Sequence, residues 1–266
     1  MKKKAYILIA LYFIYGISVS LIHPVTPEYV ISLHLSDFFY GIFFSMMALG
    51  MFAGSWFFGW MSKRFKRTPL LCLGILGYAL GQALFGFINT IPILILVWRF
   101  FGGFCVAAPW AFYATFANDL TTNNNARDRL ILMLAPIEII GEAAGYKIGG
   151  FLYSNTPLSF RHIFIIQVSF LILLSLSTFL VLRKEDIAKS KSDRENAVKT
   201  KNAFSLNKML IPFFGIIALT TISTIMTTKY AEKYIIEIGF NRAIFIDGYS
   251  PDNIVTENIN NIIIDI

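Results

Sequence analysis

The chain alternates between long apolar runs and short polar breaks. A helix that crosses a bilayer needs about 20 mostly apolar residues, and seven runs approach or exceed that length. The pattern therefore predicts an all-α integral membrane protein with seven membrane helices. The predicted spans cover residues 5–25, 38–60, 69–87, 91–116, 130–153, 163–182 and 209–228.

The composition agrees with this prediction. Of the 266 residues, 56% are hydrophobic and 15% are charged, whereas about 25% of the residues in a soluble domain are charged. The apolar run that follows Lys2–Lys4 could belong to a signal peptide. It extends over residues 5–22, however, and the apolar core of a signal peptide is only about 7–15 residues long. We therefore expect a retained first helix.

The distribution of Lys and Arg predicts the orientation of the chain. The turn at residues 59–68 carries four cations between two spans, and short loops rich in Lys and Arg stay in the cytoplasm. On the side of this turn, the N-terminus, the loops and the segment 183–208 together carry seventeen Lys and Arg, against Arg161 alone on the other side. We therefore expect a multi-pass protein of the cell membrane with a cytoplasmic N-terminus.

The net charge of +7 would also suit a nucleic-acid partner. Because the cations flank apolar spans and the chain has no soluble basic domain, we expect the lipid bilayer as the partner and no nucleic acid.

The polar breaks divide the chain into four parts. Residues 1–183 are expected to form a six-helix bundle, and residues 184–207 a flexible cytoplasmic linker. Residues 208–240 would then contain the first helix of an incomplete second bundle. The tail, residues 241–266, is rich in Asn, Asp and Ile and contains no apolar run of bilayer length.

Three local patterns resemble those of the major facilitator superfamily (MFS). GWMSKRFKRT resembles the loop signature between its second and third spans, matched at Gly59, Arg64 and Arg67, although Lys63 stands where an Asp is expected. RFFGGFCVAAPW resembles an R-x-x-x-G pattern in the fourth span, with Arg99 and Gly103 in place. GEAAGYKIGG resembles the antiporter-type pattern of the fifth span, although Tyr146 replaces its Pro. The matching residues there are Gly141, Gly145, Gly149 and Gly150.

The resemblance implies a fold and a function. Such transporters have two six-helix halves that rock around a shared site, so this chain would supply one half and one further helix, with the second half truncated. It implies a secondary transporter of a small solute coupled to H⁺, with efflux of drug-like or metabolite cargo favoured by the fifth-span pattern. A homodimer or a second polypeptide would supply the missing half. The alternative is a truncated, non-transporting fragment or a membrane scaffold.

Three ionisable residues inside spans are the candidate site. Arg99 lies in the fourth span, and in the family this arginine is linked to proton coupling or substrate contact; a structural ion pair is the alternative. Glu138 and Glu142 are one turn apart on one face of the fifth span, where a carboxylate could carry a proton. Their alternative is a fixed pair with Arg99 or Lys147. We expect all three candidates on the face that the second half would cover.

Two further features concern packing and gating. Gly141, Gly145 and Gly149 form a small-residue stripe, which lets helices approach closely, and we expect it at the interface with the missing half. Asp119 could pair with Arg64 or Arg67 at the cytoplasmic ends of the spans, or simply be solvated. No catalytic motif, metal-ligand cluster or cofactor-binding loop is recognisable, so no enzyme, metal or cofactor is expected.

Overall fold

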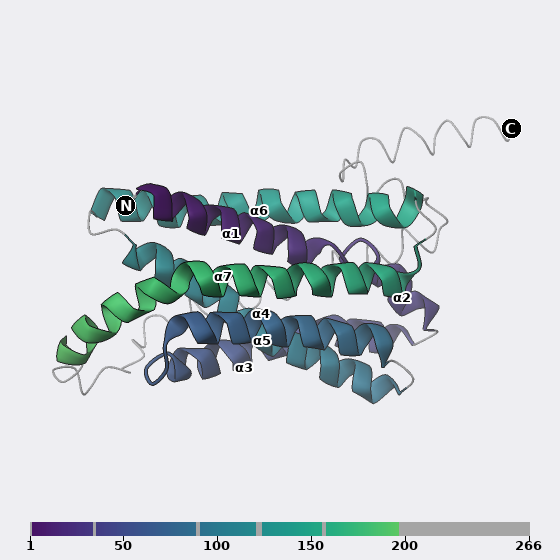
Figure 1. Cartoon of the computed structure of the whole chain (residues 1–266). Coiled ribbons are helices and arrows are strands. Elements are labelled where there is room, and N and C mark those ends of the chain that lie inside the picture. The colour runs from purple at the N-terminus through teal and green to yellow at the C-terminus, as the bar shows by residue number, and fades with distance from the viewer. Residues whose placement is uncertain (1, 34–35, 89–90, 121–123, 156–157, 197–266) are drawn as a thin grey trace, which may run out of the picture.

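The computed structural model describes residues 2–33, 36–88, 91–120, 124–155 and 158–196. The predicted seventh span, the end of the predicted linker and the tail lie outside these residues. All regular elements of the described residues are α-helices (Figure 1). The helices are α1 (Lys2–Ser20), α2 (Thr26–Ser32), α3 (Asp37–Met61), α4 (Arg67–Phe87), α5 (Pro92–Asp119), α6 (Asn124–Asn155) and α7 (Phe160–Asn196).

The six long helices coincide with the first six predicted spans. By length and composition alone, α3, α4, α5 and α7 could each cross a membrane, whereas the apolar part of α1, Lys4–Ser20, is shorter. The main difference lies in α7, which continues to Asn196 instead of ending near Leu182. The first part of the predicted linker is thus helical, because about half of residues 184–196 are the helix-favouring types Lys, Glu, Arg and Ala and the segment contains no Gly or Pro.

The end of the first span differs from the prediction. Helix α1 stops at Ser20, and the chain turns before α2 begins at Thr26 with Pro27 in its first turn. Proline lacks a backbone N–H and is tolerated in a first helical turn, so Pro24 and Pro27 separate the two helices. The Thr26 hydroxyl closes the turn by donating to the carbonyl of Ile22 at 2.9 Å. Helix α2 occupies residues that we expected to form a loop.

The helices run roughly along one axis, with the N-terminus and the α3–α4 turn at one end and α2 at the other (Figure 1). Helix α1 packs along α6, and both α3 and α4 pack along α5. Helix α7 lies between these groups and contacts α4 and α1. The outer surface carries large apolar side chains, such as Phe52, which is 81% exposed, as expected where a helix faces lipid.

Glycines set the distance between α3 and α5. A Cβ atom at Gly103 would overlap the backbone carbonyl of Met47, and one at Gly50 would overlap that of Phe100. Side chains of any size at these positions would push the helices apart. The contact brings the preceding turn of α5, with Arg99, against the aromatic side chains of α3.

The stripe on α6 packs inside the bundle, against α1. A Cβ atom at Gly145 would overlap the carbonyl of Ile17, and one at Gly16 of α1 would lie 3.0 Å from the carbonyl oxygen of Glu138. Gly141 faces Phe13 of α1, Gly149 faces Leu21, which directly follows α1, and Gly150 is also buried. The expectation that this stripe faces a second half is therefore wrong, because α1 already fills the groove that the glycines leave.

Candidate functional site

Arg99 lies inside the bundle, in a cradle of aromatic rings. Its side chain is only 5% exposed. The guanidinium carbon is 4.6 Å from the ring centre of Phe43 and 5.9 Å from those of Phe44 and Phe85. Rings at such distances attract a cation through the negative face of their π system. We expected Arg99 on an open face; it is instead enclosed by α3 and α4, because the glycines of α3 and α5 let these helices close over it.

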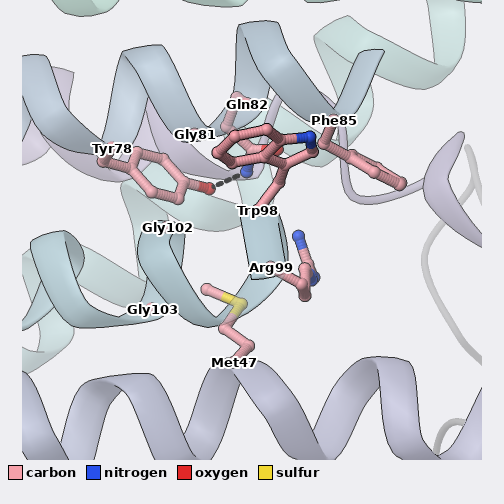
Figure 2. Close-up of a pocket in the computed structure, with 9 residues that line it drawn as sticks. All are labelled: Met47, Tyr78, Gly81, Gln82, Phe85, Trp98, Arg99, Gly102 and Gly103. Carbon is pink, nitrogen blue, oxygen red and sulfur yellow. Dashed lines mark hydrogen bonds between the residues drawn. The ribbon is translucent and has the colours of Figure 1, made fainter. Parts of the chain in front are cut away.

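The pocket around Arg99 is narrow. Figure 2 shows Tyr78, Gln82 and Phe85 of α4 on one side and Met47 of α3 on the other. Within it, Arg99 Nε and Trp98 Nε1 are buried without a hydrogen-bond partner among the described residues. The pocket has no space for a water molecule in this conformation. Two buried hydrogen-bond donors of neighbouring residues thus lack an acceptor among the described residues.

Glu138 and Glu142 lie along the α1–α6 contact and are half-buried. The hydroxyl of Tyr12 donates a hydrogen bond to Glu138 Oε2 at 2.6 Å, whereas Glu138 Oε1 is buried without a partner in the described part of the chain. Neither carboxylate forms an ion pair with Arg99 or with Lys147, whose side chain is exposed. The alternative of a fixed pair with either cation is therefore wrong for this conformation.

Tyrosines surround the carboxylates and lead toward Arg99. The ring of Tyr113 is centred 4.8 Å from that of Tyr12 and 5.8 Å from that of Tyr15. Tyr78, on α4, is fully buried and lies within the electrostatic range of both Arg99 and Glu142. The predicted residues Glu138 and Glu142 thus lie close together, whereas no hydrogen bond or ion pair joins either of them to Arg99 in the described part of the chain.

An ion pair lies beside the α3–α4 turn. Arg67 at the start of α4 donates to Asp119 at the end of α5, which is one of the two alternatives that the sequence left open. Arg64 does not share this contact and lies over the ring of Trp60, 4.6 Å from its centre. Gly59 faces open space, so packing does not require a glycine there. The pair ties the ends of two neighbouring helices together.

Sequence reasoning missed several residues of the site. Tyr12, Tyr78, Gln82 and Gln167 all hold polar groups in the interior. The two glutamines could have been noticed, since an amide inside an apolar span needs a hydrogen-bond partner from a neighbouring helix. The tyrosines carry no such signal, because tyrosine is common both in cores and at membrane surfaces.

Known proteins resemble this chain in sequence. The model of the Major Facilitator Superfamily matches residues 8–251. Multidrug resistance protein 1 of Bacillus subtilis (strain 168) is 31% identical over 173 residues, covering 64% of this chain and 44% of the relative. Multidrug resistance protein 2 of the same organism is 29% identical over 148 residues, covering 54% and 37%. The chain thus spans less than half the length of these relatives.

Two solved structures share the fold. A D-xylose-proton symporter superposes with a TM-score of 0.60 at 15% identity, over 91% of this chain and 63% of the symporter. A bacterial homolog of the human lysosomal transporter Spinster, in an inward-facing and unoccupied conformation, superposes with a TM-score of 0.52 at 18% identity. That match covers 68% of this chain and 42% of the homolog.

Proposed function

Because the chain belongs to the major facilitator superfamily, a family of membrane transporters, we propose that it takes part in the proton-coupled efflux of a small drug-like or metabolite cargo. The names of the two Bacillus subtilis relatives support drug-like cargo. The same family membership points to transport rather than to catalysis.

The proposal of proton coupling is based on the carboxylate pair on α6. Glu138 and Glu142 lie inside a membrane bundle, half-buried, without an ion-pair partner among the described residues. An ionised carboxylate is costly in such surroundings, and a proton removes the charge. A group that gains and loses a proton as its surroundings change can link the proton gradient to a conformational cycle. Arg99 is proposed to act with this pair by sensing its charge.

We further propose that a second bundle completes the transport site. Transporters of this fold rock two bundles about a site between them, and the described helices form one bundle. The second could be supplied by a second copy of the chain or by another polypeptide. Light scattering of the purified protein in mild detergent distinguishes a monomer from a dimer. A monomer that shows saturable solute flux after reconstitution would contradict this proposal.

The first prediction concerns Glu142. Replacing it by Gln keeps the shape and the hydrogen-bonding capacity but fixes the neutral form, so transport driven by a pH gradient should be lost while cargo binding is retained. Glu138→Gln should weaken the same transport, since it also removes the acceptor of the Tyr12 hydrogen bond. Flux into proteoliposomes and equilibrium binding of a fluorescent drug-like cargo measure the two properties separately.

The matched control for Glu142→Gln is Lys147→Gln, an exposed charge on the same helix, which should change neither property. If Glu142→Gln loses binding and transport to the same extent, the carboxylate contacts cargo or supports the fold, and its role as the proton carrier is refuted.

The second prediction concerns orientation. We expect the α3–α4 turn in the cytoplasm, because Lys63, Arg64, Lys66 and Arg67 cluster there. Single cysteines at Ser62 and Thr156, in a chain with Cys72 and Cys105 replaced, should differ in their reaction with a membrane-impermeant thiol reagent on intact cells. Labelling at Thr156 alone supports the proposed orientation, and labelling at Ser62 alone would reverse it.

A further inference from the structure

The turn between α3 and α4 presents cations beside exposed aromatic rings. Lys63, Arg64 and Lys66 are exposed, and so are the side chains of Trp60 and Phe65, by 43% and 57%. The turn separates two helices that are each long and apolar enough to cross a membrane. Aromatic rings are enriched where the hydrocarbon of a bilayer meets the lipid headgroups. These five residues, the basic–aromatic turn, therefore lie at the level of the headgroups when α3 and α4 cross a bilayer.

The backbone of this turn is held by its own hydrogen bonds. The N–H of Lys63 donates to the carbonyl of Trp60 at 3.2 Å, and those of Arg64 and Phe65 both donate to the carbonyl of Met61 at 2.9 Å. Carbonyl groups at the end of α3 thus find their partners within the turn. The side chains of the turn therefore project from an ordered segment.

Arg64 is positioned by Trp60. Its guanidinium carbon lies over the indole, 4.6 Å from the ring centre. A guanidinium carries its N–H donors in a planar fork that matches two oxygens of a phosphate. No carboxylate of the described residues meets this fork. Arg64 is therefore a positioned donor for an anion that the described part of the chain does not supply.

The described residues leave most of the charge of the turn without a counter-ion. Asp119, which contacts this turn, is bound to Arg67, and the three exposed cations have no acidic partner among the described residues. Residues 59–68 contain no Asp or Glu, and Lys63 stands where the MFS loop signature has an Asp. A carboxylate at this position would repel a phosphate, whereas the ammonium group attracts it.

An apolar stripe continues from the turn along α3. Phe52, Trp56 and Trp60 follow one another at intervals of four residues, so they share one face of the helix, and they are 81%, 74% and 43% exposed. Arg64 follows Trp60 by the same interval. The stripe is on the order of 12 Å long, against about 15 Å for the hydrocarbon of one leaflet. A molecule that joins an anionic head to a long apolar chain fits this surface, and a phospholipid is such a molecule.

We infer that the basic–aromatic turn and the stripe of α3 bind an anionic phospholipid. Arg64, together with Lys63 and Lys66, holds the phosphate, and one acyl chain lies along the stripe. A zwitterionic lipid carries its own cation beside the phosphate, so it gains less from the three cations of the turn. The site goes beyond the proposed function, since it depends neither on the α6 carboxylates nor on the cargo, and it exists in either orientation of the chain.

Trp60 itself offers the readout. Replacing Trp56, Trp98 and Trp110 by Phe leaves it as the only indole of the chain. Bromine atoms on an acyl chain quench the emission of an indole that they contact. The purified full chain is placed in vesicles of equal amounts of phosphatidylglycerol and phosphatidylcholine, with bromine on one lipid or on the other. A cation near the membrane surface favours anionic lipid about five-fold, so the three cations should give phosphatidylglycerol a preference of about ten-fold or more at Trp60.

Neutralising the turn should remove this preference. Arg64→Gln should lower it about five-fold, and neutralising Lys63, Arg64 and Lys66 together by Gln should bring the two lipids close to parity. Lys63→Asp should lower the preference further than Lys63→Gln, because it adds a repulsive charge. The matched control, which should keep the preference, neutralises three exposed cations outside the turn. They are Arg129, Lys147 and Arg161, each replaced by Gln.

A second measurement uses the chain with all four of its tryptophans. Phosphatidylglycerol added to the protein in mild detergent should raise the unfolding temperature by several degrees more than phosphatidylcholine does. The variant with the three cations of the turn neutralised should lose this difference. The result decides the question even if the Trp60-only protein does not fold.

Equal quenching by the two lipids would overturn the inference. So would an equal loss of preference in the control variant, because the attraction would then be a property of the whole surface. Quenching by neither lipid would show that a second copy of the chain or another polypeptide covers the stripe, and no lipid site would remain.

Inorganic phosphate distinguishes the lipid from a free anion. If it abolishes the preference at an ionic strength at which chloride does not, the turn binds phosphate ions and the lipid site is refuted. A preference that both salts weaken equally supports the lipid site, because salt screens exposed charges. These outcomes are separate from the proposed function: transport that does not need Glu142 would refute proton coupling there and leave the lipid preference unchanged.

Discussion

Replacing Gly145 by leucine is expected to separate α1 from α6 and to destabilise the protein severely. Even a Cβ atom at this position would overlap the carbonyl oxygen of Ile17 and lie 3.0 Å from its Cα. Both positions lie within regular helices, so neither backbone can move without displacing a whole helix. Overpacking in a core costs about 1–3 kcal/mol, and a clash against backbone should reach or exceed the upper end of this range.

The effect of Gly145→Leu should extend to the site. Glu138 is about two turns away on the same helix, and its hydrogen bond to Tyr12 crosses the α1–α6 contact. Thermal unfolding in detergent should show a loss of several degrees, together with loss of proton-driven transport. Ala143→Leu is the matched control, because Ala143 is exposed on the same helix. Equal unfolding temperatures for the two variants would mean that the close α1–α6 contact does not form.

The apolar runs were sufficient to predict the helices. Six long helices were located to within a few residues at most of their ends, because a helix that crosses a bilayer needs a long apolar run, which is visible in the sequence. Two of the larger differences have local causes. Pro24 and Pro27 redirect the chain before α2, and the residues after Leu182 favour a helix through their own propensity, without apolar character.

The packing partners could be predicted less well. The stripe at Gly141, Gly145 and Gly149 shows that something packs closely there, but nothing in its spacing says which helix does so. The same holds for Arg99: its position within a span indicates enclosure, and the choice of Phe43 and Phe85 as neighbours depends on how α3 and α4 are placed. The Arg67–Asp119 pair could be anticipated as one alternative, since two opposite charges end neighbouring spans on the same side.

Replacing Arg99 by methionine is expected to separate stability from transport. The guanidinium is buried without an acidic partner among the described residues, and it is held mainly by aromatic rings. Contacts of this kind are worth about 0.5–2 kcal/mol. Placing an arginine at the centre of a membrane helix costs about 2.5–3.5 kcal/mol on insertion scales. Because the cost exceeds the gain, and methionine is flexible and apolar enough to fill the cradle, the variant should unfold at the same temperature or a higher one.

Transport by the Arg99→Met variant should nevertheless be lost, since the charge that is proposed to act with the α6 carboxylates is gone. Arg99→Lys should recover only part of the transport, because an ammonium group lacks the planar face that stacks on Phe43. Arg161→Gln, at an exposed position, is the control for the loss of one positive charge. A fall of several degrees in the unfolding temperature of Arg99→Met would instead show that Arg99 is held by a stabilising partner and is retained for the fold. If the variant keeps both its transport and its unfolding temperature, Arg99 has no part in the transport mechanism.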